Sequence, residues 1–216
     1  MDGNGRWAKK RLLPRSSGHR AGVEAMHRIV KGCISLGIPY ITTYAFSTEN
    51  KKRPKAEVNA LMGLIKDSFS SFLDDMLKND MRITTMGDLS YFPEDLQEIF
   101  NESVSKSANG KRGALNIALN YGSRDEILRA VNEAVKRGNE VDYEQFARLL
   151  YTCDMPDPDL IVRTGGEKRL SNFMLYQSAY SEFYFSDTLW PDFNTEELGK
   201  ILENYSARER RFGKVK

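Results

Sequence analysis

The stretch Ala114–Arg137, ALNIALNYGSRDEILRAVNEAVKR, decides the fold class of this chain. Its first six residues form a short apolar run, which is typical of a buried strand. From Arg124 onward, apolar residues recur every three or four positions, as they do on one face of a helix. A strand that leads through a polar turn into a helix is the repeating unit of α/β proteins.

The same alternation recurs along the rest of the chain. We expect strands at Tyr40–Phe46, Arg82–Met86, Ala114–Leu119, Leu160–Thr164 and Glu182–Phe185. We expect helices at Gly22–Leu36, Ala56–Asn79, Pro93–Ala108, Arg124–Arg137, Tyr143–Leu150 and Thr195–Tyr205. The pattern predicts one α/β domain over residues 1–216, with a mostly parallel central sheet and helices on both faces.

Composition limits the possible functions. The 216 residues include 32 basic and 30 acidic side chains, so the net charge of +2 provides no overall field that would attract nucleic acid. Two distant cysteines, Cys33 and Cys153, favour reduced thiols over a disulfide framework or a zinc site. No run reaches the roughly 18 apolar residues of a membrane span, and no secretion signal opens the chain. We expect a cytoplasmic protein.

Polar, glycine-bearing segments follow the expected strands at Ser47–Asn50, Gly87–Asp88, Asn120–Arg124 and Gly165–Arg169. Because the carboxyl ends of parallel strands share one edge of a sheet, these segments should converge on one crevice. The ionisable and hydroxyl groups that we expect near it are Asp2, Arg6, Arg15, His19, Glu49, Arg53, Arg163, Arg169, Ser171 and Glu182. Several arginines among few carboxylates favour pyrophosphate groups with a divalent metal.

The opening segment, MDGNGRWAKK, has the composition of a phosphate-binding loop. Gly3 and Gly5 would let the backbone turn its N–H groups toward an anion, Asp2 could ligate a hard cation, and Arg6 could pair with phosphate. Such a loop should follow a strand, so we expect a first strand before Met1. An ordinary Asn-Gly turn is the alternative reading of the segment taken by itself.

Familiar nucleotide and zinc motifs are absent from the sequence: it contains no G-x-x-x-x-G-K-[ST], no G-x-G-x-x-G after a strand and no H-E-x-x-H.

The region after Lys55 places a broad apolar face on a long helix, with Val58, Leu61, Met62, Ile65, Phe69, Phe72, Leu73 and Met76 at helical spacing. From periodicity alone, packing against the protein core is a better explanation of this apolar face than ligand binding. Below a phosphate-binding rim, however, it would suit an amphiphile with a hydrocarbon tail.

Several blocks together resemble the cis-prenyltransferase (isoprenyl transferase) family, typified by bacterial undecaprenyl diphosphate synthase. They are MDGNGRWA, GHRAG (18–22), YAFSTEN with Arg53-Pro54, LNIALNYG, PDPDLIVRTGGEKRLSNF (156–173), YSEFYF and LWPDF (189–193), in the family's order. The resemblance implies that family's fold, with a hydrophobic tunnel beside the sheet. It also implies a Mg²⁺-dependent enzyme that adds isopentenyl diphosphate units to an allylic diphosphate, such as farnesyl diphosphate. By the same resemblance, the default product is undecaprenyl diphosphate, the cell-wall lipid carrier.

The resemblance also implies residue roles. Asp2 would be the essential carboxylate and a metal ligand, with Glu182 as the second metal carboxylate. The allylic diphosphate would lie among Gly3, Asn4, Gly5, Arg6, Trp7, Arg15 and His19. Isopentenyl diphosphate would bind Arg163, Arg169, Leu170 and Ser171. Asn50 would lie where the proton leaves, with Ser47, Thr48, Glu49, Lys51 and Arg53 as substrate-binding neighbours.

Two positions depart from the family's pattern: Lys51 replaces a common tryptophan, and Lys168 replaces a histidine that some members place near the metal. For partners, the family implies a homodimer, whose R-x-G tail would be Arg211–Gly213 here, and no nucleic acid. Because the product is a membrane lipid, we also expect transient peripheral contact with the inner face of the membrane.

Two alternatives belong to other functional classes. The chain could be a non-catalytic partner subunit of a heteromeric cis-prenyltransferase, but such partners lack the aspartate loop and the R-T-G-G-E-x-R-x-S block. It could instead be a phosphate- or RNA-binding module that uses the Lys9–Arg11 and Arg208–Lys216 clusters. Charge runs of that kind are usually solvated faces.

Overall fold

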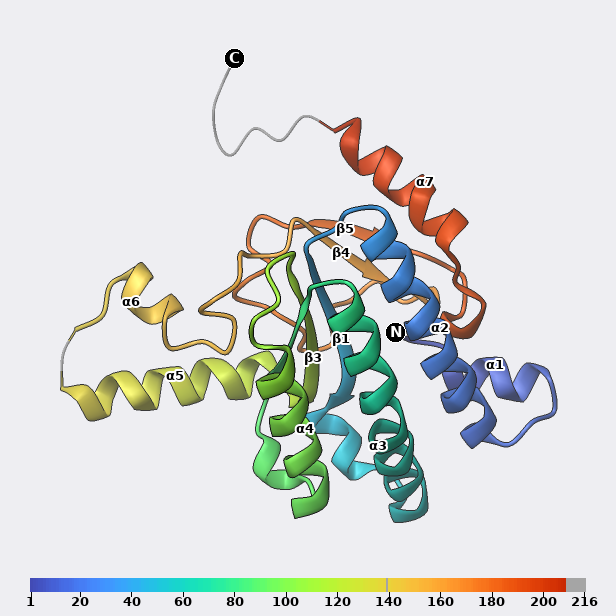
Figure 1. Cartoon of the computed structure of the whole chain (residues 1–216), viewed down its shortest axis with the longest axis horizontal. Helices are drawn as coiled ribbons and strands as arrows, with labels where there is room; N and C mark the ends of the chain where they lie inside the picture. Colours follow the sequence, from blue (N-terminus) through green and yellow to red (C-terminus); the bar gives the residue numbers. More distant parts are fainter. Residues whose placement is uncertain (139, 209–216) are drawn as a thin grey trace.

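Helices and strands alternate along the chain in the computed structural model, which describes residues 1–138 and 140–208 (Figure 1). The elements are α1 (Asn4–Lys10), α2 (Arg15–Ser35), β1 (Tyr40–Ser47), η1 (Thr48–Lys52), α3 (Lys55–Lys78), β2 (Arg82–Met86), η2 (Leu89–Tyr91), α4 (Glu94–Ser107), β3 (Ala114–Tyr121), α5 (Ser123–Arg137), α6 (Tyr143–Ala147), β4 (Leu160–Arg163), β5 (Glu182–Phe185), η3 (Trp190–Asp192) and α7 (Thr195–Ser206). Every predicted strand and helix is present; Arg82–Met86 and Glu182–Phe185 keep their predicted ends, and the others differ at one or both ends. The R-x-G segment, Arg211–Gly213, lies outside the described residues.

The predicted loop at the start of the chain is wrong from Asn4 onward, because Asn4–Lys10 is the helix α1. Arg6 to Lys10 are residues of good or moderate helix propensity, and nothing in them opposes a helix. Gly3 is the residue that permits the turn into α1: its φ is +114°, and a Cβ there would lie 2.9 Å from the side chain of Leu189. Gly5 is helical and plays no such part.

The expected single central sheet is divided into two parallel sheets. One has the order β1-β3-β2, and the other consists of β4 and β5. All eight residues of β3 are buried, as expected for the middle strand of a covered sheet. The division arises because no described segment forms a strand that would hydrogen-bond β1 to β4. Side chains of both sheets nevertheless contribute to one apolar core.

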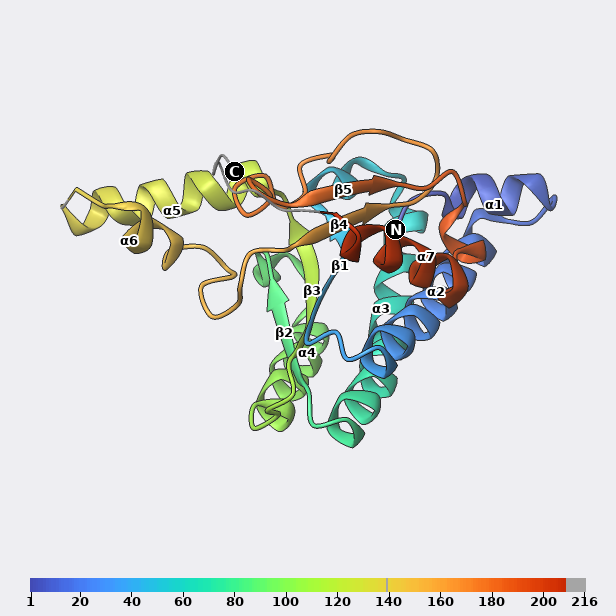
Figure 2. The same cartoon turned by 90° about the horizontal axis from the view of Figure 1, so that it is seen from above.

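Helices cover one face of the three-stranded sheet, where α2, α3 and α4 lie side by side (Figures 1 and 2). Their apolar side chains form the largest core cluster with β1, β2 and β3. The other face is covered mainly by irregular chain: Met86, Ala118 and Tyr121 pack against Met174 and their neighbours. The prediction of helices on both faces is therefore only half correct, and α5 and α6 project outward from that second side (Figure 1).

Candidate active site

A pocket of about 180 Å³ lies between α2 and α3 and reaches the start of the chain. Its polar lining comes from Asp2, Gly3, Asn4, Gly5, Arg15, His19, Asn50 and Arg53, near the beginnings of both helices. Its apolar lining comes from residues further along the helices and from β3, including Val23, Met26, Leu61, Leu64, Ile65, Phe69, Phe72, Ile117 and Leu119. The pocket therefore has a charged mouth and an apolar interior, which suits an amphiphilic ligand.

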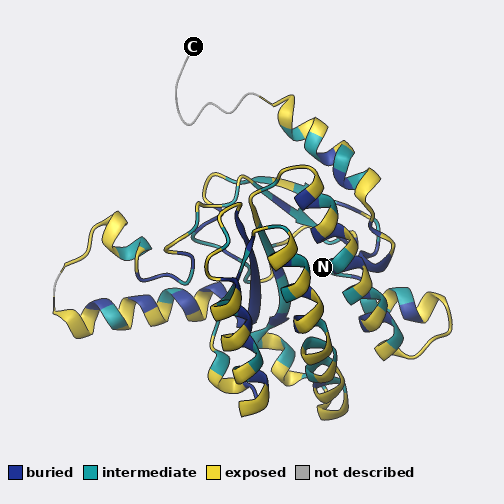
Figure 3. Ribbon diagram, in the orientation of Figure 1, coloured by how far each residue is buried: buried dark blue, intermediate teal, exposed yellow. Residues whose placement is uncertain are grey.

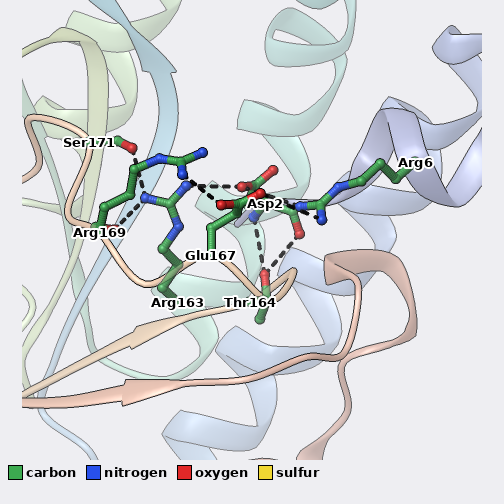
Figure 4. Close-up of polar contacts among 7 residues, drawn as sticks. All are labelled: Asp2, Arg6, Arg163, Thr164, Glu167, Arg169 and Ser171. Atoms are coloured by element: carbon green, nitrogen blue, oxygen red, sulfur yellow. Dashed lines mark hydrogen bonds and ion pairs between the residues drawn. The ribbon is translucent and has the colours of Figure 1, made fainter.

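Asp2 and Arg163 join two segments that lie far apart in the sequence (Figure 4). Arg163 Nη2 donates to Asp2 Oδ2 at 3.0 Å, and Arg163 Nη1 donates to Ser171 Oγ at 2.7 Å and to the carbonyl of Arg169. Arg6 approaches the same Asp2 oxygen at 3.5 Å. The sequence predicted that these residues converge, and the structure brings them together.

The backbone of Asp2 is fixed as firmly as its side chain. Its N–H donates to Thr164 Oγ1 at 3.1 Å, and its carbonyl accepts from Thr164 Oγ1 and from the N–H of Trp190. Burial raises the pKa of the Asp2 carboxyl, but the hydrogen bond and charge of Arg163, with the charge of Arg6, outweigh it and lower the pKa below its usual value. The carboxylate is therefore ionised at neutral pH.

Glu57 was missed by the sequence reasoning and organises the other side of the pocket mouth. Its Oε1 accepts from Arg15 Nε at 3.0 Å and from Arg53 Nη1 at 3.0 Å, and it lies 3.2 Å from His19 Nε2. The side chain is only 14% exposed. Its place in the first turn of α3 could have indicated this role, because carboxylates are favoured near the N-terminus of a helix and the cation Arg53 lies just before it.

His19 is buried next to this carboxylate. Burial lowers the pKa of its imidazole, and the hydrogen bond and charge of Glu57 oppose that effect without reversing it. His19 is thus neutral at pH 7 and holds one proton on its ring. Because the Glu57 carboxylate can only accept, that proton lies on Nε2 and is donated to Glu57. Arg15 and Arg53 supply the hydrogen-bond donors at the pocket mouth that suit phosphate oxygens.

The segment after β1 forms the 3₁₀ helix η1, which positions Asn50. Asn50 Oδ1 accepts from the Ser47 N–H at 3.2 Å, and the Ser47 side chain accepts from the Asn50 N–H, so the two residues form a capping box. Thr48 and Glu49 face away from the pocket lining, toward Asp125 and Asn172 respectively. Only Asn50 of this segment lines the pocket, together with Arg53 beyond it.

Several predicted residues lie away from this pocket. Trp7 donates from Nε1 to Asp192 Oδ1 at 2.6 Å and is not among the residues that line the pocket, so its contact with the allylic substrate stays a prediction. Lys51 lies 4.4 Å from the centre of the Tyr91 ring, outside the lining. Leu170 sits between Arg169 and Ser171, where its carbonyl accepts from the Phe173 N–H at 3.1 Å.

Glu182, predicted as the second metal carboxylate, lies apart from Asp2 within this chain, and its metal role stays a prediction. Glu182 begins β5 opposite Leu160, whereas Arg163, which holds Asp2, lies opposite Phe185. Three residues along a strand separate the two ends by about 10 Å. Glu182 instead accepts a hydrogen bond from Arg208.

Comparison with known proteins identifies the family. Residues 1–213 match the family model described as putative undecaprenyl diphosphate synthase. The chain belongs to the isoprenyl transferase, or cis-prenyltransferase, family. It is 51% identical over 223 residues to an isoprenyl transferase of Clostridium perfringens, covering all of this chain and 88% of that protein. It is 50% identical to an isoprenyl transferase of Treponema denticola, covering 99% and 94% of the two chains.

Solved structures agree with this assignment. Lavandulyl diphosphate synthase from Lavandula x intermedia, in complex with dimethylallyl diphosphate, superposes with a TM-score of 0.94 at 34% identity over 99% of this chain and 95% of that one. A probable undecaprenyl diphosphate synthase from Campylobacter jejuni gives 0.81 at 36% identity over 90% and 93%. The protein is therefore an isoprenyl transferase enzyme, and neither alternative from the sequence is supported.

The side chains at the pocket mouth of this isoprenyl transferase fit one metal ion, whose remaining ligands would come from the substrate. No group of three or more His, Cys, Asp or Glu side chains that could hold a metal occurs among the described residues. Asp2, ionised and at the pocket mouth, supplies a single carboxylate, and Mg²⁺ commonly binds through one or two carboxylates together with substrate phosphates and water. In the described part of the chain, no helix is long and apolar enough to span a bilayer.

Proposed function

We propose that this enzyme condenses isopentenyl diphosphate with an allylic diphosphate to form a cis-polyprenyl diphosphate, with Mg²⁺ required. The observation that carries the proposal is the contact between Asp2 and Arg163 at the mouth of an apolar pocket. On one side of it lie Arg15, His19 and Arg53, and on the other lie Arg169 and Ser171. Two diphosphates could therefore bind next to each other, with the hydrocarbon chain in the pocket.

In the proposed reaction, the C–O bond of the allylic diphosphate breaks and its electron pair leaves with the diphosphate. The new C–C bond forms between the allylic carbon and the terminal alkene carbon of isopentenyl diphosphate. Asp2, together with substrate phosphate oxygens, would hold Mg²⁺, whose charge would neutralise the leaving group. Arg15, Arg53 and the Asn4 side chain bind and orient the allylic diphosphate, while Arg163 and Ser171 orient the second diphosphate.

A proton must also leave C2 of isopentenyl diphosphate, the methylene carbon on the far side of the cationic C3 from the new bond, and its electron pair forms the new C2=C3 double bond. Asn50 lines the pocket, but its amide is a very weak base, and its Oδ1 already accepts from Ser47. We assign Asn50 an orienting role and the departing diphosphate the role of proton acceptor. The neutral His19 donates its one ring N–H to Glu57 and so helps to hold the carboxylate that positions Arg15 and Arg53.

Farnesyl diphosphate as primer and undecaprenyl diphosphate as product are the finer parts of the proposal. They rest on the similarity to the family described as putative undecaprenyl diphosphate synthase and to the Clostridium and Treponema isoprenyl transferases. A homodimer is also proposed. An exposed apolar stripe along α5, formed by Leu128, Val131 and Val135, supports it, since such a stripe would be covered by a second copy.

The test is incubation of the protein with Mg²⁺, farnesyl diphosphate and radiolabelled isopentenyl diphosphate, followed by butanol extraction and separation of products by length. We expect extractable label with the unaltered chain, and loss of nearly all of it in Asp2→Ala and after chelation of Mg²⁺. If folded protein yields no extractable product with any allylic primer from five to twenty carbons, the proposed reaction is wrong.

A further inference from the structure

The turn between α1 and α2 exposes two leucines. Leu12 is 95% exposed, more than any other large apolar side chain of the described residues, and its neighbour Leu13 is 44% exposed. The turn lies at the outer edge of the molecule in both views (Figures 1 and 2), and its surroundings are exposed (Figure 3). Both side chains therefore face the surroundings of the protein.

The backbone holds these leucines in place. The Leu13 N–H donates to the carbonyl of Ala8 at 3.0 Å, and the Leu12 N–H donates to that of Lys9 at 3.2 Å, which together form the Schellman arrangement at the end of α1. Leu12 has a φ of +55°, at the position where glycine is usual. An apolar surface that covered the exposed Leu12 side chain would stabilise it, because burial removes apolar area from water.

Cations surround this leucine tip. Lys9, Lys10 and Arg11 precede it and Arg20 follows within the first turns of α2. Within the ranges that the structure describes, no ion pair involves Lys9 or Lys10, whereas Arg11 pairs with Asp192 at 3.2 Å. Arg11 also lies 4.2 Å from the centre of the Trp7 ring. Exposed leucines beside cations and a tryptophan match the chemistry of an anionic bilayer surface.

We propose that the leucine tip, Leu12 and Leu13, inserts into the headgroup region of an anionic lipid bilayer, with Lys9 and Lys10 binding lipid phosphates. Arg15, two residues after the tip, lines the pocket. Insertion would therefore hold the pocket mouth next to the membrane. If the proposed function is also correct, a long hydrocarbon product could pass from the pocket to the bilayer without crossing water. The membrane contact itself does not depend on that activity.

Vesicle flotation of the full chain tests the contact without any substrate. Vesicles of phosphatidylcholine with about one-third phosphatidylglycerol should bind the unaltered protein, and pure phosphatidylcholine should bind it several-fold less. Leu12→Ser/Leu13→Ser should weaken binding to the anionic vesicles roughly tenfold. Lys9→Gln/Lys10→Gln should weaken it by about fivefold per cation and reduce its dependence on salt. The matched control, Leu36→Ser/Leu77→Ser, alters two exposed leucines elsewhere, one directly after α2 and one on α3.

Product formation in detergent, measured separately, should be unchanged by the Leu12→Ser/Leu13→Ser substitution, which shows that the variant is folded. The proposal is overturned if the unaltered chain does not bind anionic vesicles, or if both leucine pairs weaken binding equally. It is also overturned if the Leu12→Ser/Leu13→Ser variant binds vesicles normally and instead changes the mass in sedimentation equilibrium, because the tip would then contact protein.

Discussion

Neutralising Glu57 is expected to loosen the pocket mouth. In Glu57→Gln the side chain keeps its shape, but the one oxygen shared by Arg15, His19 and Arg53 loses its charge. Hydrogen bonds to a charged group are worth about 1.5–3 kcal/mol when protected from water. Arg15 is largely exposed and Arg53 is half-buried, so solvent screening reduces the contribution of each of their contacts with Glu57 to about 0.5 kcal/mol of stability. The buried contact between Glu57 and His19 contributes about 1 kcal/mol. The free energy of unfolding should therefore fall by about 2 kcal/mol.

Chemical denaturation measures this change, and thermal unfolding should shift by about 4–8 °C for a chain of this size. The matched control is Glu133→Gln, which neutralises an exposed pair with Arg137 on α5 and should cost less than about 0.5 kcal/mol. Because Arg15 and Arg53 lose the carboxylate that positions both of them, kcat/KM for the allylic diphosphate should drop on the order of tenfold. Equal stability changes in the two variants would refute the reasoning that Glu57 organises this site.

Three further predictions concern single positions. Gly3→Ala should destabilise the chain by about 1–3 kcal/mol in denaturation, since it places a Cβ at φ +114° and 2.9 Å from Leu189. Gly199→Ala on α7, where a Cβ meets nothing within 4 Å, should stabilise it by about 0.5–1 kcal/mol. Because the pKa of His19 is lower in the folded protein, its contribution to stability is complete above about pH 6.5 and is lost as the pH falls through the folded pKa. Unfolding measured between pH 7.5 and 5 should therefore show a slope that His19→Gln reduces, and an unchanged slope would count against a buried neutral His19.

The elements of the fold were predictable where local pattern and burial agree. β3 combines an apolar run with complete burial, and the helix after it follows from its periodicity. The division of the sheet was not predictable, because strand pairing depends on which segments meet in space. The start of α1 was mispredicted because glycines at positions 3 and 5 suggest a loop, although only Gly3 has a left-handed conformation.

The candidate site could likewise be predicted only in part from the sequence. Asp2, Arg163 and Ser171 were predicted together because Arg163 lies near the end of a predicted strand, Ser171 lies in the segment after it, and the segment around Asp2 has the composition of a loop that follows a strand. Glu57 was overlooked because it belongs to a helix whose apolar face dominates the pattern. Glu182 was assigned to the metal site by resemblance, and its strand register puts it at the far end of β5 from Arg163. Register is set by the pairing of β4 with β5, which the residues alone do not reveal.

Separate KM values for the two substrates test the central claim most directly, namely that two diphosphates bind on either side of Asp2. In Arg163→Ala, the KM for isopentenyl diphosphate should rise at least tenfold, while the KM for the allylic diphosphate changes less than threefold. Arg53→Ala should show the reverse selectivity, because Arg53 lies on the Glu57 side of the pocket mouth. If both variants raise both KM values equally, or if the two selectivities are exchanged, the two-sided arrangement of the site is wrong.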